Sequence, residues 1–178
     1  MNILETKRLL LRQFRPEDAA DNYRIYSDPQ TMEFMGKPPE SIGFEREQIR
    51  KHAANYYEKF GFGLWAVVLK EKDQLIGRCG LLRQEIENAT EVEVSYLPDR
   101  NFWGRGLATE AAREVVKLGF ERYEFPRIIA LIMPENTASV RVAEKVGMKY
   151  ERDVYYKDFG KVAMYVLKAE DFIHHRRG

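Results

Sequence analysis

"NFWGRGLATEA", residues 101–111, is the stretch from which the fold and the chemistry of this chain are best approached. Gly104 and Gly106 flank Arg105, and a run of good helix formers follows them. Glycine lowers helix propensity, so the pair indicates either a turn with positive φ or a close approach to the backbone. A turn from a strand into a helix whose N-terminal amides bind an anion requires both a positive φ and a close approach to the backbone. The glycines alone fit either explanation.

The hydrophobic pattern changes its period across this stretch. Residues 91–97, EVEVSYL, alternate strictly and predict a strand in which Glu93 and Val94 face opposite sides. The next segment has apolar residues at helical spacing and predicts a helix to about residue 123, with one stripe formed by Leu107, Ala111, Val115 and Leu118. A strand followed by a glycine turn and a helix is therefore the expected centre of the fold.

The rest of the chain supplies hairpins before this centre and a mixed unit after it. Upstream, the patterns predict strands at 7–14, 63–71 and 74–83, helices at 16–27 and 44–60, and a turn at 84–90. Downstream, they predict a strand at 127–133, a helix at 136–146 and strands at 148–157 and 161–168. This order predicts one α+β domain spanning 1–178, with a single mixed, mostly antiparallel sheet of about six to seven strands and helices on both faces.

Composition excludes several classes of function. The formal net charge of the 178 residues is +1, which gives no general attraction to nucleic acid or to an anionic membrane. Cys79 is the only cysteine, and His52, His174 and His175 are scattered or terminal, so neither a disulfide nor a metal site is expected. Without a signal peptide or an apolar run of about 20 residues, we expect a cytoplasmic protein whose last residues, HHRRG, are a solvated tail.

Three types of phosphate-binding loop can be compared with residues 101–111. The P-loop motif G-x-x-x-x-G-K-[ST] is absent, and the dinucleotide fingerprint requires a third glycine where this chain has Thr109. A shorter loop of the type [Q/R]-x-x-G-x-[G/A] remains, in which the first position is Asn101 with Arg100 beside it. Asparagine can hydrogen-bond a phosphate, but it does not bring the charge of arginine.

Four segments together resemble the GNAT acetyltransferases, and in particular the group of the ribosomal-protein N-terminal (alanine/serine) acetyltransferases. The two central segments are "EVSYLPDRNFWGRGLATEAA" (93–112) and "PENTASVRVAEKVGMKYE" (134–151). The opening "LETKRLLLRQF" (4–14) and the hairpin "LWAVVLKEKDQLIGRCGL" (64–81) extend the likeness over nearly the whole chain. The resemblance implies the GNAT fold and an enzyme that transfers the acetyl group of acetyl-CoA to a primary amine by direct attack in a ternary complex.

The resemblance also implies a position for acetyl-CoA and requires no metal. The main-chain amides from Gly104 to Thr109 would hold the diphosphate. The full set of residues expected at the coenzyme is Leu97, Asp99, Trp103, Gly104, Arg105, Gly106, Leu107, Ala108, Thr109, Asn136 and Ser139. Arg141 and Lys145 could meet the 3′-phosphate of the coenzyme, although a solvated helix face explains them equally well.

Two catalytic roles, a base and an acid, follow from the same resemblance. Glu93 is the expected base that takes the proton of the amine, with Glu91 as the second choice and a plain surface charge as the alternative. Ser139 is expected near the sulfur, where the leaving thiolate needs a proton, and Asn136 and Ser139 could also be an ordinary helix start. Tyr150 and Tyr156 are the other candidates for this acid.

The oxyanion of the tetrahedral intermediate needs a main-chain donor at the end of the strand. Pro98 has no N–H group, so Leu97 or Asp99 is the candidate. The acceptor amine is not specified by these motifs, and we expect residues 28–60 and the last hairpin to select it. It could be a protein N terminus or a small molecule, and the protein a monomer or a homodimer.

Two other classes of function use the same loop. A non-catalytic sensor would bind acyl-CoA without turnover, and a nucleotide-binding or nucleic-acid-binding protein would use the loop for a different phosphate. The net charge near zero argues against nucleic acid as a partner.

Overall fold

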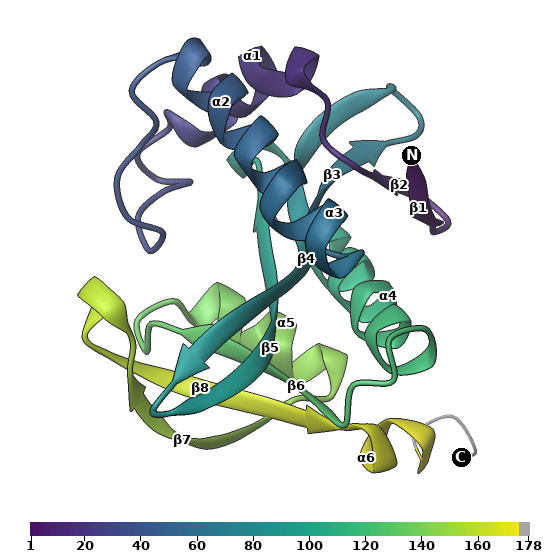
Figure 1. Cartoon of the computed structure of the whole chain (residues 1–178), viewed down its shortest axis with the longest axis vertical. Helices are drawn as coiled ribbons and strands as arrows, with labels where there is room; N and C mark the ends of the chain where they lie inside the picture. Colours follow the sequence, from purple (N-terminus) through teal and green to yellow (C-terminus); the bar gives the residue numbers. More distant parts are fainter. Residues whose placement is uncertain (175–178) are drawn as a thin grey trace.

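Eight strands form one mixed sheet in the computed structural model, which describes residues 1–174 (Figure 1). The strand order is β1-β2-β3-β4-β5-β6-β8-β7. The strands are β1 (Asn2–Glu5), β2 (Leu9–Arg12), β3 (Leu64–Leu69), β4 (Gln74–Ile86), β5 (Ala89–Pro98), β6 (Arg127–Ile132), β7 (Lys149–Tyr155) and β8 (Lys161–Lys168). The helices are α1 (Ala19–Tyr26), α2 (Ile42–His52), α3 (Glu58–Phe60), α4 (Leu107–Glu121), α5 (Thr137–Val146) and α6 (Ala169–His174).

All neighbouring strands are antiparallel except β5 and β6, which are parallel. Those two strands share a single register pair, Glu93 with Ile129, whereas β4 and β5 pair along ten positions from Gly77–Pro98 to Ile86–Ala89. The sheet therefore opens between β5 and β6 on either side of that pair, in its middle rather than at an edge. Side chains near the opening can be reached from outside the sheet.

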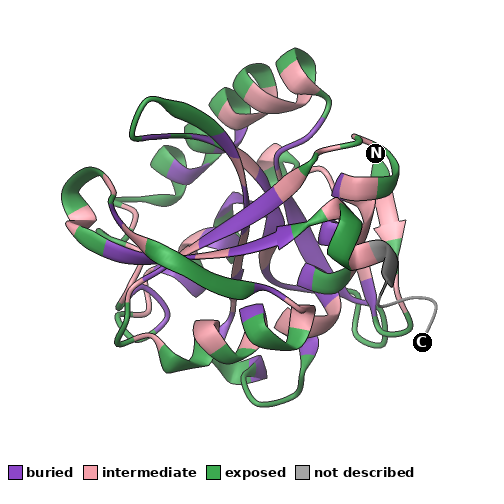
Figure 2. Ribbon diagram, turned by 90° about the horizontal axis from the view of Figure 1, so that it is seen from below, coloured by how far each residue is buried: buried purple, intermediate pink, exposed green. Residues whose placement is uncertain are grey.

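Helices cover both faces of the sheet, as the sequence predicts. The largest core cluster joins α4 and α5 to one face, and its members include Trp65 of β3 and Leu81 of β4. A second cluster joins Ile25 and Tyr26 of α1 to Ala66 on the other face. Figure 2 shows the buried residues gathered in the central strands, while the helices turn exposed sides outward. Alternate residues of one strand thus enter different cores, as the period of two requires.

Several boundaries differ from the expectations. The sheet has eight strands rather than six to seven, because Asn2–Glu5 pairs with β2 as an additional edge strand. Residues 84–86, expected in a turn, continue β4, and only Glu87 and Asn88 turn, both with positive φ. The helix expected over 44–60 contains a π-helical turn at Ala53–Tyr57 between α2 and α3. Residues 175–178, part of the expected solvated tail, lie outside the described residues.

Candidate functional site

The turn before α4 has the conformation that its glycines allow. Gly104 and Gly106 have φ of 74° and 72°, in the left-handed region that other residues rarely adopt. A methyl group added at Gly104 would meet no atom within 4 Å, so the loop is open on that side. The first hydrogen bond of α4 runs from Glu110 N to Gly106 O (3.0 Å). The amides of Leu107, Ala108 and Thr109 precede it and have no acceptor within the helix.

The β1–β2 hairpin holds this turn from behind. Arg8 Nη1 donates to Arg105 O (2.9 Å), and Arg8 Nε donates to Glu110 Oε2 (2.6 Å). Thr6 Oγ1 donates to the other carboxylate oxygen of Glu110 (2.5 Å). No sequence pattern connects residue 8 with residues 105 and 110, because this contact spans about a hundred residues. Arg8, Thr6 and Glu110, hereafter the hairpin clamp, fix the turn against the start of α4.

A cavity of about 370 Å³ lies in front of the turn, between α4 and α5. Of the residues expected at the coenzyme, nine line it: Leu97, Trp103, Gly104, Gly106, Leu107, Ala108, Thr109, Asn136 and Ser139. Arg141 and Lys145 of α5 also line it, at the positions that the sequence analysis considered for a phosphate. Arg105 and Asp99 do not. Arg105 places its guanidinium over the ring of Phe102, with 5.2 Å to the ring centroid.

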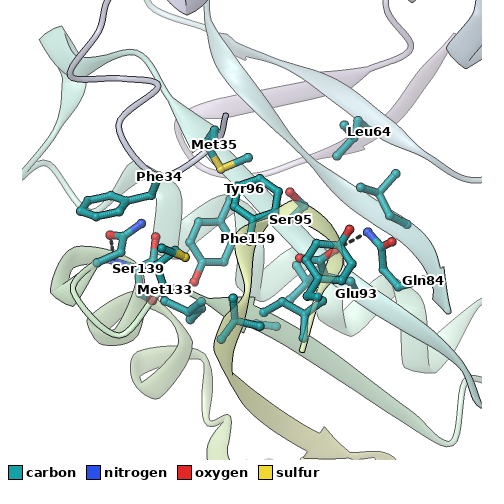
Figure 3. A pocket seen from close by; sticks show the side chains of 18 of the residues that line it. Phe34, Met35, Leu64, Gln84, Glu93, Ser95, Tyr96, Met133, Ser139 and Phe159 are labelled. Atoms are coloured by element: carbon teal, nitrogen blue, oxygen red, sulfur yellow. Dashed lines mark hydrogen bonds between the residues drawn. The ribbon is translucent and has the colours of Figure 1, made fainter. Parts of the chain in front are cut away.

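A second cavity of about 210 Å³ occupies the opening between β5 and β6 (Figure 3). Glu93 and Ser95 of β5 line one side, and Leu131 and Met133 line the other. The two cavities adjoin each other, because they share five lining residues: Phe34, Met35, Tyr96, Asn136 and Ser139. We call them the larger and the smaller cavity. A molecule lying on the turn before α4 can therefore extend into the sheet opening.

Glu93 is a buried carboxyl group in the smaller cavity, not a surface charge. It is 9% exposed, and Gln84 Nε2 donates to its Oε2 (2.6 Å; Figure 3). Burial raises the pKa of the Glu93 carboxyl to about 7, against the opposing effects of the Gln84 hydrogen bond, the Lys157 charge and the Leu131 amide. The group can therefore exchange a proton near neutral pH, as a general base must.

Glu91, the second choice for the base, has a different environment. Both of its carboxylate oxygens accept from Arg127, with 3.0 Å from Arg127 Nε to Glu91 Oε2, and it lines neither cavity. Its two carboxylate oxygens are thus occupied by a two-pronged ion pair away from the sheet opening. The structure therefore favours Glu93 over Glu91 as the residue that can act as a base in the sheet opening.

The start of α5 is both a capped helix and part of the site. Asn136 Oδ1 accepts from Ser139 N (3.1 Å), which is the helix-cap arrangement considered in the sequence analysis. Both residues nevertheless line both cavities, so capping and ligand contact are compatible here. Tyr96 of β5 donates its hydroxyl to Ser139 O (2.8 Å) and so connects the strand to this helix start.

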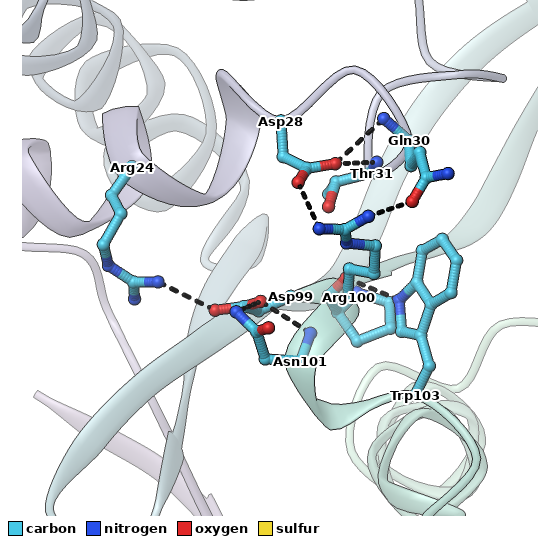
Figure 4. Close-up of polar contacts among 9 residues, drawn as sticks. Arg24, Asp28, Gln30, Thr31, Asp99, Arg100, Asn101 and Trp103 are labelled. Carbon is cyan, nitrogen blue, oxygen red and sulfur yellow. Dashed lines mark hydrogen bonds and ion pairs between the residues drawn. The ribbon is translucent and has the colours of Figure 1, made fainter.

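The expectation that Asp99 offers an oxyanion donor is wrong, because its amide already donates to Ile76 O (2.7 Å). Its side chain is also occupied: Oδ1 accepts from Asn101 N (2.9 Å), and Oδ2 pairs with Arg24 (2.9 Å; Figure 4). Asp99 is thus an anchor for the turn that precedes α4. Leu97 lines the larger cavity, but it pairs with Arg78 in the same ladder, so its amide points toward β4 as that of Asp99 does.

Arg100 and Asn101 are used for structure rather than left free for a ligand. Arg100 forms an ion pair with Asp28 (3.3 Å) and a hydrogen bond with Gln30, so it ties the 28–31 segment to this turn (Figure 4). Asn101 Nδ2 donates to Asp99 Oδ1 (3.0 Å). The position at which the resemblance expects glutamine or arginine therefore serves the local turn in this chain.

Comparison with known families decides the class of the protein. Residues 8–149 match the family model described as the acetyltransferase (GNAT) domain, which covers most of the chain. The chain belongs to the GNAT acetyltransferases. Two bacterial relatives from Bacillus subtilis (strain 168) are each 34% identical to this GNAT protein. YkkB, described as an uncharacterized protein, matches over 156 residues, 85% of this chain and 87% of its own. YoaA, described as an uncharacterized N-acetyltransferase, matches over 152 residues, 84% of each chain.

Solved structures agree with this assignment. A GNAT-family acetyltransferase from Bacillus anthracis has a TM-score of 0.79 at 26% identity, covering 96% of this chain and 99% of its own. RimL, described as a ribosomal L7/L12 alpha-N-protein acetyltransferase in complex with coenzyme A, has a TM-score of 0.79 at 15% identity, covering 96% and 99%. The likeness to RimL shows the fold alone. The GNAT fold and enzyme class are thus confirmed, whereas the narrower group stays a prediction.

Two predicted acids have different positions in this GNAT protein. Tyr150 is 55% exposed on β7, donates its hydroxyl to Asp153 (3.1 Å) and lines neither cavity. The structure therefore does not bring it together with Glu93 and Ser139. Tyr156, named only as an alternative, lines the smaller cavity with both of them. Strand register decides this difference, and register cannot be read from a short alternating pattern.

The sequence reading missed several residues that line the smaller cavity. Gln84 was expected in a turn, and its role as the partner of Glu93 depends on the longer β4. Phe34 and Met35, by contrast, belong to the 28–60 range that we expect to select the acceptor, although their turn segment has no regular pattern to place them. Arg78 of β4 also lines this cavity, and nothing in the hairpin motif marks an arginine for that purpose. The sequence feature that could have identified Arg78 is its position as a charged residue within an otherwise apolar strand.

Two negative findings apply to the described residues. Within residues 1–174 no group of three or more histidine, cysteine, aspartate or glutamate side chains is arranged to hold a metal ion. None of the helices in that part of the chain is long and apolar enough to span a membrane.

Proposed function

We propose that this GNAT protein transfers the acetyl group of acetyl-CoA to a primary amine by direct attack in a ternary complex. The observation that carries the proposal is that the two cavities adjoin each other. The open amides before α4 border one cavity and the buried carboxyl of Glu93 borders the other, and Tyr96, Asn136 and Ser139 line both. This is the arrangement needed to bring an activated acyl group and an amine to the same place.

The coenzyme would lie in the larger cavity. The amides of residues 104–109 would bind its diphosphate, because they lie at the positive end of α4 and the turn is open at Gly104. Arg141 and Lys145 would supply positive charge for the 3′-phosphate from the facing helix. RimL, a protein of the same fold, was solved with coenzyme A, which supports the choice of ligand.

The amine would enter the smaller cavity and lose a proton to Glu93. An alkylammonium has a pKa of about 10, so its lone pair becomes available only when a base takes this proton, directly or through water. The amine nitrogen then attacks the thioester carbon, a C–N bond forms, and the C–S bond breaks. The nitrogen gives up two protons in all: Glu93 takes the first, and the second, released once the C–N bond has formed, replaces the proton that is passed to the thiolate.

The leaving thiolate and the oxyanion need further groups. The Ser139 hydroxyl, which lines both cavities, would supply the proton that the thiolate takes up, and Tyr156 is the second candidate. A main-chain amide of β5 that faces the sheet opening would donate to the oxyanion, since Pro98 has no N–H and the amides of Leu97 and Asp99 face β4.

The proposal is tested by release of free thiol from acetyl-CoA in the presence of a panel of primary amines, with the N-acetyl product identified by mass. Thiol release that depends on the amine and matches the product one to one is the expected result. Tight binding of acetyl-CoA with no product from any amine would contradict catalysis and favour a sensor. An N-acetylated amine would exclude the sensor.

A further inference from the structure

Arg78 is a charged side chain in the smaller cavity that the proposed reaction does not use. It lies on β4, and its guanidinium stands over the ring of Tyr26, with 4.7 Å from Cζ to the ring centroid. Tyr26 is 2% exposed, and its apolar neighbours include Ala66, Leu75 and Leu97. The positive charge is therefore held beside an apolar cluster at the wall of the acceptor side of the site.

No protein group satisfies this guanidinium within the described part of the chain. The Arg78 Nε is buried and has no hydrogen-bond partner, and no ion pair joins Arg78 to a carboxylate. Glu45 of α2 is close enough for the charge of Arg78 to lower its pKa, but burial has the larger effect and raises the pKa of the Glu45 carboxyl. Glu45 therefore balances the charge of Arg78 only in part. A half-buried cation without an acceptor is costly in a folded protein unless a ligand provides the missing charge.

The cavity that Arg78 lines is the smaller one. It does not line the larger cavity, where the turn before α4, Arg141 and Lys145 lie. An anion that reaches Arg78 therefore belongs to the molecule that occupies the sheet opening with Glu93, not to the diphosphate of a coenzyme held by the turn. The smaller cavity has a proton acceptor at one position and a free cation at another.

The strand register gives the separation of these two groups. Glu93 pairs with Leu82, and Leu82 follows Arg78 by four residues on the same face of β4. Four residues of extended strand span about 13 Å between α-carbons, so a ligand that contacts both groups must be extended. The wall between them is mostly apolar, with Leu64, Leu82, Phe34 and Met35. An α-amino acid is too short to reach both groups, because its amine and carboxylate share one carbon.

We propose that the acceptor is a primary amine that also carries a carboxylate several bonds away, and that Arg78 binds this carboxylate while Glu93 receives the proton of the amine. The inference depends on the function proposed above. The smaller cavity fits a free ω-amino carboxylate best, because the methylene groups of such a molecule can pack against the apolar wall. A peptide with a free N terminus and an acidic side chain has the same two charges and is the other source to distinguish.

The test compares amines that differ only in the carboxylate. Acetyl transfer to 6-aminohexanoate is measured against hexylamine, with glycine as the short amino acid, in the wild type and in Arg78→Gln. The peptide arm compares alanyl-glutamate amide with alanyl-glutamine amide. We expect the wild type to favour 6-aminohexanoate over hexylamine about tenfold or more in kcat/KM, as a charge-assisted contact allows, and to use glycine poorly. Arg78→Gln should lose most of this preference.

Arg83→Gln is the matched control. Arg83 lies on the same strand and also places its guanidinium over an aromatic ring, 5.0 Å from the centroid of Phe60, but it is exposed and lines neither cavity. The preference should be the same in Arg83→Gln as in the wild type. A wild-type ratio near one, or a ratio that Arg78→Gln leaves unchanged, would overturn the inference. A larger preference within the peptide pair would assign the carboxylate to a peptide.

Calorimetry separates this inference from the proposed function. The protein saturated with coenzyme A is titrated with 6-aminohexanoate and with hexylamine, so no turnover is needed. Tighter binding of 6-aminohexanoate that disappears in Arg78→Gln supports the role of Arg78 even if no amine is acetylated. Equal binding of the two amines would contradict it even if acetyl transfer is found.

Discussion

At the scale of single residues, the environment of Glu93 is the feature on which the proposed chemistry depends. A carboxyl group with a pKa of about 7 is mostly protonated below neutral pH and mostly ionised above it. Only the ionised form can take a proton from an amine. Burial is what moves this equilibrium into the physiological range, and the hydrogen bond from Gln84 keeps the carboxyl oriented.

Replacing Glu93 by glutamine should remove the base while keeping the shape of the side chain. With the amine saturating, we expect the wild-type kcat to rise with pH up to about 7 and then level off, as Glu93 loses its proton. In Glu93→Gln, kcat at pH 7 should fall about 10²-fold or more, and this rise should disappear. Glu91→Gln is the control and should keep the wild-type midpoint. A Glu93→Gln profile with the same midpoint would exclude Glu93 as the base.

The same pKa predicts a pH-dependent change in stability. The folded-state pKa of about 7 is above the ordinary 4.5, so Glu93 contributes stability below pH 4.5 that is lost as pH rises through 7. Glu93→Gln avoids this loss because glutamine does not ionise. Urea unfolding should therefore show the variant gaining on the wild type between pH 4.5 and 7, by up to about 3 kcal/mol. A constant difference across this range would show that Glu93 titrates normally.

At the scale of secondary-structure elements, the start of α4 is where sequence reading was most informative. Two glycines at a strand-to-helix turn predicted positive φ and open amides, and Gly104 and Gly106 have both. These are local properties, which a short stretch of sequence determines. The hairpin clamp could not be predicted, because the contact of Arg8 with Glu110 depends on where the tertiary fold places an edge hairpin.

Gly104→Ala tests whether the open turn binds the coenzyme. We expect the coenzyme A dissociation constant from calorimetry to rise about tenfold, because a methyl group would stand in front of the amides. Gly61→Ala is the matched control: its φ is 75°, a methyl group there also meets no atom within 4 Å, and it lines neither cavity. Both variants should lose about 1 kcal/mol of unfolding free energy. Equal coenzyme affinity in the two variants would mean that the turn does not hold the diphosphate.

Loss of the hairpin clamp should weaken binding of acetyl-CoA and leave binding of the amine unchanged. Arg8→Ala removes the bonds to Arg105 O and Glu110, so the turn loses its support. We expect the KM for acetyl-CoA to rise several-fold with little change in the KM for the amine, and Arg8→Lys to restore part of the loss. Lys70→Ala is the control, since Lys70 bonds to Thr6 O in the same hairpin without touching the turn. An equal rise in both KM values would indicate a general loss of structure instead.

At the scale of the whole molecule, the order of elements was sufficient to predict a mixed sheet with helices on both faces. The opening between β5 and β6 could not be predicted, because a sequence pattern does not show how many register pairs two parallel strands form. That opening is what makes Glu93 a cavity residue. The same limit explains why Gln84 was expected in a turn and Tyr150 at the site, since each position depends on the length or register of a strand.

The position of the coenzyme relative to this opening is the most direct test of the proposed function. A crystal structure of the protein with bound coenzyme A measures it. We predict that diphosphate oxygens lie about 3 Å from main-chain nitrogens of residues 104–109, with the sulfur end directed toward Tyr96 and Glu93. A coenzyme bound elsewhere, with those nitrogens facing only water, would contradict the proposed reaction.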